Sequence, residues 1–451
     1  MSVNQSELQP KLDRLNTALE SGAMDQVRRM LNRSLAPVDV AHLLESTPPR
    51  ERELLWELIE ADIQGEVLQY LNEDIQTEFL NRMDAAQLLS ATEGLDIDDL
   101  ADLLQRLPNT VIQEVLASME TQERLRVETV LSYPEDTAGG LMNTDTITIR
   151  PDITLDVVLR YVRRHEALPD STDTLLVVTR RDELIGTLAI NKLLVCDPSV
   201  SVREVMETDI IKIAALAPED DVARLFEKFD LISAPVVSTD GKLLGRITID
   251  DVVDVIRENA EHRVMSMAGL EDDEDTFAPV LRTGRRRAVW LGINLVAATI
   301  VSFAIGIFED TIQRITALAV LMPIVSSMGG IAGSQTLTVL IRGIALGHVS
   351  GSNVRWLLVR EMLSGMMNGV LWALIVALMA VARFDDYKLG GIIALAMVIN
   401  LSIAALAGTL IPVLLKKLSI DPALSGGVLL TTITDVVGFV AFLGLATAFY
   451  P

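Results

Sequence analysis

One carboxylate lies inside the last long apolar stretch of the sequence. Asp435 comes twelve residues into the stretch 423–450, directly after a run that contains Thr431, Thr432 and Thr434. A charged carboxylate at the centre of a membrane costs about 2.5–3.5 kcal/mol even on insertion scales, and this stretch contains no Lys or Arg to pair with it. A protonated Asp bonded to a threonine would lower that cost. Intramembrane acids more often mark an ion path, so the pattern favours a cation site with Asp435 and Thr431 as ligands.

The second apolar stretch contains small and polar residues where a simple anchor would have aliphatic ones. It reads Pro323-Ile-Val-Ser-Ser-Met-Gly-Gly-Ile-Ala-Gly-Ser-Gln335, which places glycines at Gly329, Gly330 and Gly333. Proline removes a backbone donor and glycine permits bending, so we expect an interrupted span whose carbonyl groups face an interior cavity. Glycine alone would also serve close helix packing. Together with Gln335 and Asp435, these residues favour an oxygen-lined pore.

Acidic residues are concentrated in the first 281 residues. This part contains 55 acidic and 26 basic side chains, whereas residues 282–451 contain 7 acidic and 12 basic ones. Such an excess opposes compact packing unless cations neutralise it, and hard divalent cations prefer carboxylate oxygens. A solvated face is the alternative for each single run of acids. The densest runs are Glu219–Asp221, then Asp250, Asp251 and Asp254, then Glu258 and Glu261, and finally Glu271–Asp275.

Composition excludes several classes of function. The formal net charge of −24 excludes nucleic-acid binding by general electrostatics. The single cysteine, Cys196, excludes a disulfide framework and a Cys-rich metal site, and the four histidines show no metal-ligand spacing. The sequence shows no nucleophile–base set, phosphate-binding glycine loop or zinc motif, so an enzyme is the least favoured class.

Five apolar stretches are long enough to cross ~30 Å of hydrocarbon. An odd number of spans places the two ends of the chain on opposite sides. Nine basic residues lie near the loops expected in the cytoplasm and three near the others, so the N-terminus is predicted inside and the C-terminus outside the cytoplasmic membrane. Residues 1–15 lack the pattern of a signal peptide. The stretches cover residues 288–307, 315–340, 362–382, 389–415 and 423–450.

The acidic half contains two kinds of repeat. Residues 7–130 are predicted to be helical, and the pattern of Asp39-Val-Ala-His-Leu-Leu recurs at Asp84 and Asp99, which indicates stacked helices. A sharper repeat aligns Leu176–Asn191 with Pro235–Asp250 at an offset of 59 residues. Each copy reads as strand, tight turn, strand and helix start, after an amphipathic helix and a short strand.

This second repeat resembles a tandem pair of cystathionine-β-synthase (CBS) domains, which bind regulatory ligands. The residues Thr248 and Asp251 resemble the ribose-contacting end of their nucleotide sites, and in the first copy this pattern degrades to Ala189 and Lys192. The resemblance therefore implies ATP as a possible ligand.

The order of these parts resembles the MgtE family of magnesium channels over nearly the whole chain. The resemblance is carried by Tyr133-Pro-Glu-Asp-Thr-Ala-Gly-Gly-Leu-Met142, the segment 323–335, Asp421-Pro-Ala-Leu424 and Thr432-Ile-Thr-Asp-Val-Val-Gly438. It implies a homodimer with one pore on its twofold axis and no catalytic residue. Asp435 would hold hydrated Mg²⁺, Asp421 would lie on the ion path, and Gly438 would belong to the pore backbone.

The same resemblance implies regulatory cation sites in the acidic half. Acidic residues provide most of the expected ligands, and the backbone near one glycine contributes another. The predicted set is Asp220, Asp230, Asp251, Asp254, Glu258, Glu261 and Gly140. Millimolar cytosolic Mg²⁺ bound there would favour a compact, closed form, and its loss would release a connecting helix from the pore.

We therefore predict a multidomain α plus α/β membrane protein. Residues 1–132 would form an acidic helical domain, 133–200 and 201–257 the two CBS domains, 258–285 a connecting (plug) helix with its linker, and 286–451 five transmembrane helices. The expected function is a Mg²⁺-selective, cation-gated channel that contacts membrane lipid and no nucleic acid.

Two departures from the family pattern affect ion preference and gating. Ile331 follows Gly330 where the family commonly has Asn, and Asn259 and His262 replace acids of the connecting helix. The preference among Mg²⁺, Co²⁺, Mn²⁺ and Ni²⁺ therefore stays open. A Na⁺- or H⁺-coupled divalent exchanger and a membrane-anchored CBS sensor are the alternative functions.

Overall fold

The computed structural model describes residues 23–92, 95–165, 168–169, 171–270, 275–349, 351, 353–418 and 420–450. The expected absence of a signal peptide in residues 1–15 and most of the acidic run 271–275 lie outside these residues. The chain divides into two compact units. The first comprises Met1–Ala260 with Asp273–Pro279, and the second comprises Glu261–Asp272 with Val280–Pro451. We call them the cytosolic unit and the membrane unit.

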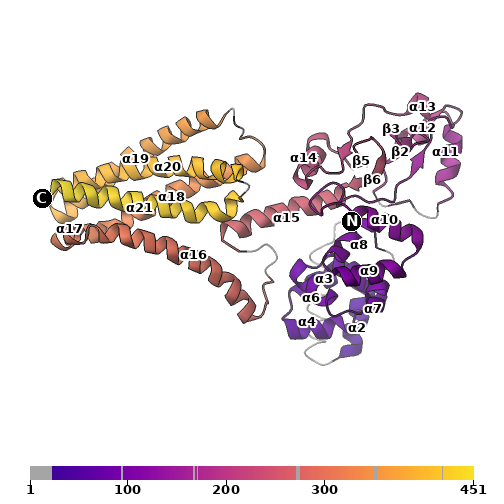
Figure 1. Ribbon diagram of the computed structural model, residues 1–451, viewed down its shortest axis with the longest axis horizontal. Helices are drawn as coiled ribbons and strands as arrows, with labels where there is room; N and C mark the ends of the chain where they lie inside the picture. Colours follow the sequence, from indigo (N-terminus) through magenta and orange to yellow (C-terminus); the bar gives the residue numbers. More distant parts are fainter. Residues whose placement is uncertain are drawn as a thin grey trace. The chain divides into compact units, whose positions relative to one another are not determined.

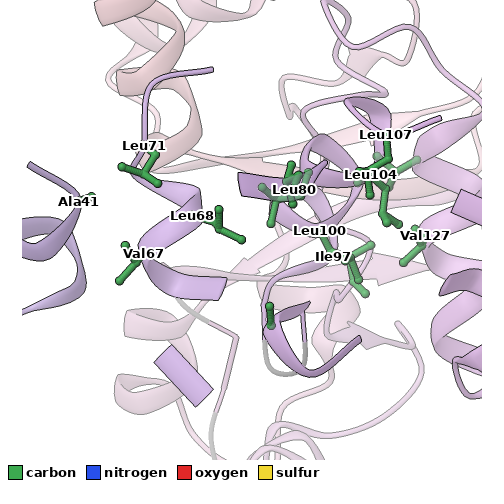
Figure 2. Close-up of a cluster of buried hydrophobic side chains, with 14 of the residues drawn as sticks. Ala41, Val67, Leu68, Leu71, Leu80, Ile97, Leu100, Leu104, Leu107 and Val127 are labelled. Atoms are coloured by element: carbon green, nitrogen blue, oxygen red, sulfur yellow. The ribbon is translucent and has the colours of Figure 1, made fainter. Parts of the chain in front are cut away.

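The cytosolic unit begins with a set of short helices that share one apolar core. Each has 8 to 11 residues, too short to be stable alone, so stability comes from packing of their leucine faces. Figure 2 shows part of this core, in which Leu68, Leu80, Leu100 and Leu104 are almost fully buried. The helices are α2 (Met24–Arg33), α3 (Pro37–Glu45), α4 (Pro49–Trp56), α5 (Ala61–Gln69), α6 (Glu73–Leu80), α7 (Ala85–Thr92), α8 (Ile97–Gln105), α9 (Asn109–Ser118) and α10 (Thr121–Leu131).

The two CBS copies fold as the offset of 59 residues predicted. In each copy a short strand pairs in parallel with the first strand of an antiparallel hairpin, and the hairpin register shifts at Val177/Val178 and at Val236/Val237. The first copy contains β1 (Thr148–Ile149), α11 (Leu155–Val162), β2 (Thr174–Val178), β3 (Leu184–Ala189), α12 (Ile190–Val195) and α13 (Val202–Val205). The second contains β4 (Ile213–Ala214), α14 (Glu219–Phe229), β5 (Ser233–Val237) and β6 (Leu243–Thr248).

The copies contact each other through equivalent residues. Glu183 forms a bridge with Lys242, its own counterpart at an offset of 59. Leu184 N donates to Gly241 O at 3.1 Å, and Leu243 N donates to Asp182 O at 2.9 Å. This reciprocal pattern is that of a local twofold axis between the copies, as in an isologous interface.

The segment before the first copy joins the sheet of the second. Asn143 exchanges backbone hydrogen bonds with Arg246 on β6, and Ala138 N donates to Ala217 O at 2.8 Å. On the first sheet Glu207 exchanges the same kind of bonds with Thr187 on β3. Each sheet is therefore completed by residues that lie outside its own sequence repeat.

Helix α15 (Ile249–Met267) starts directly after β6 and continues through the segment predicted as a connecting helix. It has no break near residue 257, so the last helix of the second CBS copy and the connecting helix are one element. Its first part belongs to the cytosolic unit, and the part from Glu261 onward belongs to the membrane unit.

Five helices of the described membrane unit are long and apolar enough to cross a membrane, which confirms the predicted number. They are α16 (Val280–Gly306), α18 (Thr316–Ala345), α19 (Val354–Phe384), α20 (Tyr387–Lys417) and α21 (Pro422–Phe449), and a short α17 (Glu309–Arg314) follows α16. Figure 1 shows α18, α19, α20 and α21 side by side, with α16 at the edge. Helix α20 is the most buried span, and α16 has no buried residue.

The expected interruption of the second span is wrong. Helix α18 is continuous across Pro323, Gly329, Gly330 and Gly333. Proline in a helix removes one hydrogen bond without necessarily ending the helix, because neighbouring helices compensate in a membrane protein. The two buried glycines instead allow close approach of α20 and α21, which is the packing role that we left open.

Candidate pore and regulatory acidic cluster

Helices α18 and α21 run antiparallel and bring Asp435 against the second span. Ser326 Oγ on α18 donates to Asp435 Oδ1 at 2.5 Å. The same two helices meet where Gly333 faces Leu430. A carboxylate in the middle of α21 therefore has a hydroxyl partner from another helix, while α21 itself contains no Lys or Arg.

Asn400 lies beside this contact and was not identified from the sequence. Its side chain is fully buried on α20 and its Nδ2 donates to Val325 O on α18 at 2.8 Å. Its Oδ1 has no hydrogen-bond partner among the described residues. A Cβ atom added to Gly329 or Gly438 would collide with the Asn400 side chain. Asn400 thus fits between the two glycines on either side of the Ser326–Asp435 contact.

A substitution at Gly329 tests this packing. Gly329→Ala is expected to lower both the thermal stability in detergent and the ion flux, because the added methyl must displace Asn400; overpacking of this kind costs typically about 1–3 kcal/mol. The matched control is Gly391→Ala on α20, where an added methyl meets nothing within 4 Å. Equal melting temperatures and equal flux for the two variants would contradict the packing described here.

The other predicted pore residues do not all gather at Asp435. Thr431 lies one turn before it on α21, is exposed, and donates to Gly427 O at 3.0 Å. Gln335 is exposed on α18, nine residues beyond Ser326. Asp421 is the N-cap of α21 and lies fourteen residues before Asp435, which is roughly 20 Å along a helix.

The carboxylate of Asp421 already has several partners. Its oxygens accept hydrogen bonds from Ala423 N at 2.9 Å and Leu424 N at 3.1 Å. His262 Nε2, on the part of α15 that belongs to the membrane unit, lies 3.4 Å from Asp421 Oδ2. Asp421 therefore caps a membrane helix and contacts the connecting helix at His262.

Besides Asp435, Glu361 is another acid that lies within a membrane helix. We did not identify it from the sequence. It is the eighth residue of α19, its side chain is 15% exposed, and Arg360 Nη1 lies 3.2 Å from its Oε1. Thr336 on α18 donates to Glu361 Oε2 over a long 3.4 Å. The predicted span began at residue 362, one residue too late to include it.

In the cytosolic unit, α8 and the start of α15 bring several acids together. Asp98 is buried and Asp99 is half-buried, and the charge of Asp251 on α15 acts on both. Asp96, Asp98 and Asp99 each place a carboxylate oxygen within 4.8 Å of the others. Asp98 Oδ1 has no hydrogen-bond partner among the described residues. We call Asp96, Asp98, Asp99, Asp102, Glu135, Glu219, Asp251, Asp254 and Glu258 the acidic cluster.

Burial is the main cause of the shifted pKa values in the acidic cluster. Together with the charge of Asp251 it raises the pKa of Asp99 to about 7, and together with the charge of Glu258 it raises the pKa of Glu219 to about 7. Burial also raises the pKa of Asp251 to about 6, although the Thr248 N–H and hydroxyl, which donate to its Oδ2, oppose the shift. Buried carboxylates without enough counter-charge need protons or metal cations.

One arginine supplies part of the counter-charge. Arg106 Nη2 lies 2.7 Å from Glu73 Oε1 and 3.8 Å from Glu135 Oε1. Its charge lowers the pKa of Asp102 and Glu135, yet burial still raises both above their usual values. Arg257 on α15 supplies more, since its Nη1 lies 3.7 Å from Asp254 Oδ1 and its charge opposes the burial that raises the pKa of Asp254 and Glu258. Two guanidinium groups among nine acids still leave a net negative cluster.

The predicted regulatory residues are only partly brought together. Asp251, Asp254 and Glu258 lie along α15 in the acidic cluster, and Asp220 lies next to Glu219 and raises its pKa. The Gly140 backbone lies against that of Glu135, because a Cβ at Gly140 would be 2.5 Å from Glu135 O. Asp230 caps α14 in a left-handed conformation and is exposed, and Glu261 belongs to the membrane unit.

Sequence reasoning overlooked the role of α8. In the sequence, Asp99 belongs to the helical repeat that also contains Asp39 and Asp84, and a residue of this type commonly precedes a helix as its N-cap. Only Asp84 takes that position, because Asp39 and Asp99 lie within the first turns of α3 and α8. The four acids at 96, 98, 99 and 102 were the available signal, since acids 3 or 4 residues apart share a helix face.

Three family models match this chain. A divalent cation transporter model (MgtE) covers residues 322–445, the MgtE intracellular N domain covers 35–136, and the CBS domain covers 138–196 and 202–258.

Two relatives agree with these matches, and one solved structure is similar to part of the chain. Magnesium transporter MgtE of Bacillus subtilis (strain 168) is 30% identical over 438 residues, which are 97% of this chain and 96% of the relative. The protein of the same name from Thermus thermophilus is 29% identical and covers 96% and 97%, respectively. A crystal structure of the cytosolic domain of the Mg²⁺ channel MgtE in complex with ATP is 31% identical, covers 53% of this chain and 98% of that chain, and gives a TM-score of 0.49.

Proposed function

The chain belongs to the MgtE family of magnesium transporters, and from this premise we propose that it forms a homodimeric Mg²⁺ channel that cytosolic Mg²⁺ closes. The observation that carries the pore assignment is the position of Asp435. This acid lies in the middle of an apolar helix, is half-buried, and has a neutral hydroxyl partner on α18. A hydroxyl leaves the carboxylate charge uncompensated, which favours an ion path.

The fit to Mg²⁺ follows from the chemistry of that ion. Mg²⁺ dehydrates reluctantly and keeps several waters, so a suitable pore site holds the hydrated ion through carboxylates and other oxygens. Asp435 and Thr431, one turn apart on α21, supply a carboxylate and a hydroxyl. Two copies related by a twofold axis would present two such carboxylates to one ion.

The exposed faces of the membrane helices support the second copy. Ser327, Ser334 and Gln335 on α18 and Thr431 on α21 are exposed in the single chain. The hydroxyls of Ser334 and Thr431 bond to carbonyls of their own helices. Hydrocarbon would offer no partner to the Gln335 amide, whereas a pore or a second copy can supply one. By contrast, the exposed side chains of α16 are mainly aliphatic and aromatic, as expected for a helix in contact with lipid.

The acidic cluster supports closure by Mg²⁺. Carboxylates from α8, α14 and the start of α15 face one another and outnumber the nearby arginines, Arg106 and Arg257, and hard divalent cations bind such oxygens. In the absence of cations, repulsion would loosen the contact between α8 and α15. Since α15 continues into the membrane unit, a change in its position can act on the pore.

Two further parts of the proposal concern orientation and nucleotide binding. The excess of basic residues near one set of loops favours a cytoplasmic N-terminus and an outside C-terminus in the cytoplasmic membrane. Thr248 Oγ1 donates to Asp251 Oδ2 at 2.9 Å, so ATP bound at these residues would share a carboxylate with the acidic cluster. We therefore expect ATP and Mg²⁺ to affect each other's binding.

Flux through purified protein in proteoliposomes tests the function. We expect Mg²⁺ entry down its own gradient without any Na⁺ or pH gradient, and a decrease as Mg²⁺ on the cytosolic face rises into the millimolar range. A requirement for a Na⁺ or H⁺ gradient would identify an exchanger instead. The absence of flux, with normal Mg²⁺ binding to the cytosolic unit, would leave a membrane-anchored sensor. Replacing Mg²⁺ by Co²⁺, Mn²⁺ or Ni²⁺ in the same assay gives the ion preference.

A further inference from the structure

A buried ion pair in the cytosolic unit joins α4 to the segment that precedes the first membrane helix. Arg52 Nη1 donates to Asp275 Oδ2 at 2.9 Å and Nη2 donates to Asp275 Oδ1 at 3.1 Å. The two side chains are 2% and 7% exposed. A bidentate contact between a guanidinium and a carboxylate fixes orientation as well as distance.

The remaining polar atoms of this pair have partners too. Arg52 Nε donates to Leu44 O at 2.8 Å, which ties the guanidinium to the end of α3. Asp275 Oδ1 also accepts from Phe277 N at 2.9 Å, and Ala278 N donates to Asp275 O at 3.0 Å. The contact therefore sets the conformation of residues 275–278 as well as holding them to the helical domain.

The contact can affect the first membrane helix because Asp275 lies only a few residues before it in the chain. Asp275 precedes Val280, the first residue of α16, by five residues. An extended chain covers at most ~3.5 Å per residue, so this tether cannot exceed roughly 17 Å. The ion pair therefore leaves only residues 276–279 between the residue held by the helical domain and the start of α16.

The contact also provides a direct route between two distant parts of the chain. Along the backbone, the helices at 23–131 reach α16 only through the CBS pair and α15. The pair Arg52–Asp275 bypasses all of these elements. Since buried ion pairs are often replaceable by apolar residues without loss of stability, a purely structural contact would not require these two charges.

We propose that the Arg52–Asp275 ion pair is a latch through which the helical domain acts directly on the first membrane helix. This inference rests on the proposed closure by Mg²⁺. When Mg²⁺ holds the helical domain against α15, the latched segment restrains the start of α16. Without the latch, the helical domain no longer holds Asp275, and its movement is not transmitted to α16 through this segment.

Flux of the full-length protein in proteoliposomes, measured against cytosolic-side Mg²⁺, tests the latch. For Arg52→Gln and Asp275→Asn we expect the Mg²⁺ concentration of half-closure to rise at least about fivefold, while flux at low Mg²⁺ stays at the wild-type value. Arg82→Gln is the matched control, because Arg82 pairs with Glu53 and Glu78 on the exposed surface of the same domain. The charge exchange Arg52→Asp with Asp275→Arg should return the half-closure concentration toward wild type.

A cysteine pair keeps the test valid if a single variant misfolds by burying an unpaired charge. Arg52→Cys with Asp275→Cys, in a Cys196→Ser background, removes both charges together. This protein should close at raised Mg²⁺ before crosslinking with a short bis-maleimide and near the wild-type concentration after it.

The outcomes separate the latch from the proposed function. If wild-type protein closes with Mg²⁺ but the single variants and the uncrosslinked cysteine pair close at the same concentration, the latch is wrong. If wild-type flux itself does not respond to Mg²⁺, the closure that the latch depends on is wrong.

Discussion

Asp435→Asn is expected to abolish Mg²⁺ flux while the protein remains folded. Asparagine has nearly the same shape and can still accept the hydrogen bond from Ser326 Oγ, so only the charge is lost. Hydrogen bonds from ion-bound water to a carboxylate are worth about 1.5–3 kcal/mol each. Loss of one carboxylate from each of two copies therefore removes about 3–6 kcal/mol, which lowers the affinity of the site for the ion by a factor of roughly 100 to 20,000.

The measurement is initial Mg²⁺ uptake into proteoliposomes with matched amounts of folded protein. Asp385→Asn is the matched control, since Asp385 is an exposed acid at the end of α19 in a left-handed conformation that asparagine tolerates. Ser326→Ala should reduce flux only modestly, because the carboxylate charge remains. Unchanged uptake by Asp435→Asn would end the pore assignment.

Lowering the pH from about 8 to about 6 is expected to weaken Mg²⁺ binding to the acidic cluster and, without Mg²⁺, to stabilise the cytosolic unit. Burial raises the folded-state pKa of Asp99 to about 7, above its unfolded value of 3.8. Between these two values the folded state binds more protons than the unfolded state, so stability falls as pH rises through the window. One pKa unit corresponds to about 1.36 kcal/mol, so Asp99 alone contributes at most roughly 4 kcal/mol over the whole window from 3.8 to about 7, and about 1.4 kcal/mol of it between pH 8 and pH 6.

Mg²⁺ and protons compete for the same oxygens in this cluster. For each proton that a bound Mg²⁺ displaces, the apparent affinity for Mg²⁺ rises about tenfold per pH unit at pH values below the raised pKa. Calorimetry of the full-length protein at pH 7, in buffers of different ionisation enthalpy, should therefore detect proton release on Mg²⁺ binding. Resistance of the cytosolic unit to trypsin should also increase with millimolar Mg²⁺, and more strongly at pH 8 than at pH 6.

Asp99→Asn should reduce both the proton release and the pH dependence of protection. Asp240→Asn is the control, because Asp240 lies exposed in the turn between β5 and β6. Protection that does not respond to Mg²⁺ at either pH would remove the gating part of the proposal.

Much of the fold was predictable because it depends on local patterns. Apolar stretches of about twenty residues form membrane helices whatever their neighbours, so the number of spans followed directly from the sequence. The 59-residue offset likewise predicted two similar hairpins. The structure adds that both shift register at the same place, between Val177 and Val178 and between Val236 and Val237. The pairing of Asn143 with Arg246 could not be predicted, because main-chain hydrogen bonds between distant segments leave no mark on residue type.

The site divides in the same way. Asp435 was recognisable alone, since a carboxylate in an apolar helix is costly wherever the helix packs. Ser326 and Asn400 were not, because serine and asparagine acquire a role only when α18, α20 and α21 bring them to that carboxylate and its flanking glycines.

The sequence by itself determined the composition of each part of this protein: an acidic half, five apolar spans and one acid in the last span. The tertiary structure alone decided that α18 remains a continuous helix, that α8 and α15 share one acidic cluster, and that Arg52 holds Asp275. The physical reason is that hydrophobicity and charge are properties of single residues. Burial, pKa and ion pairing depend on which distant residues the fold places within a few ångströms.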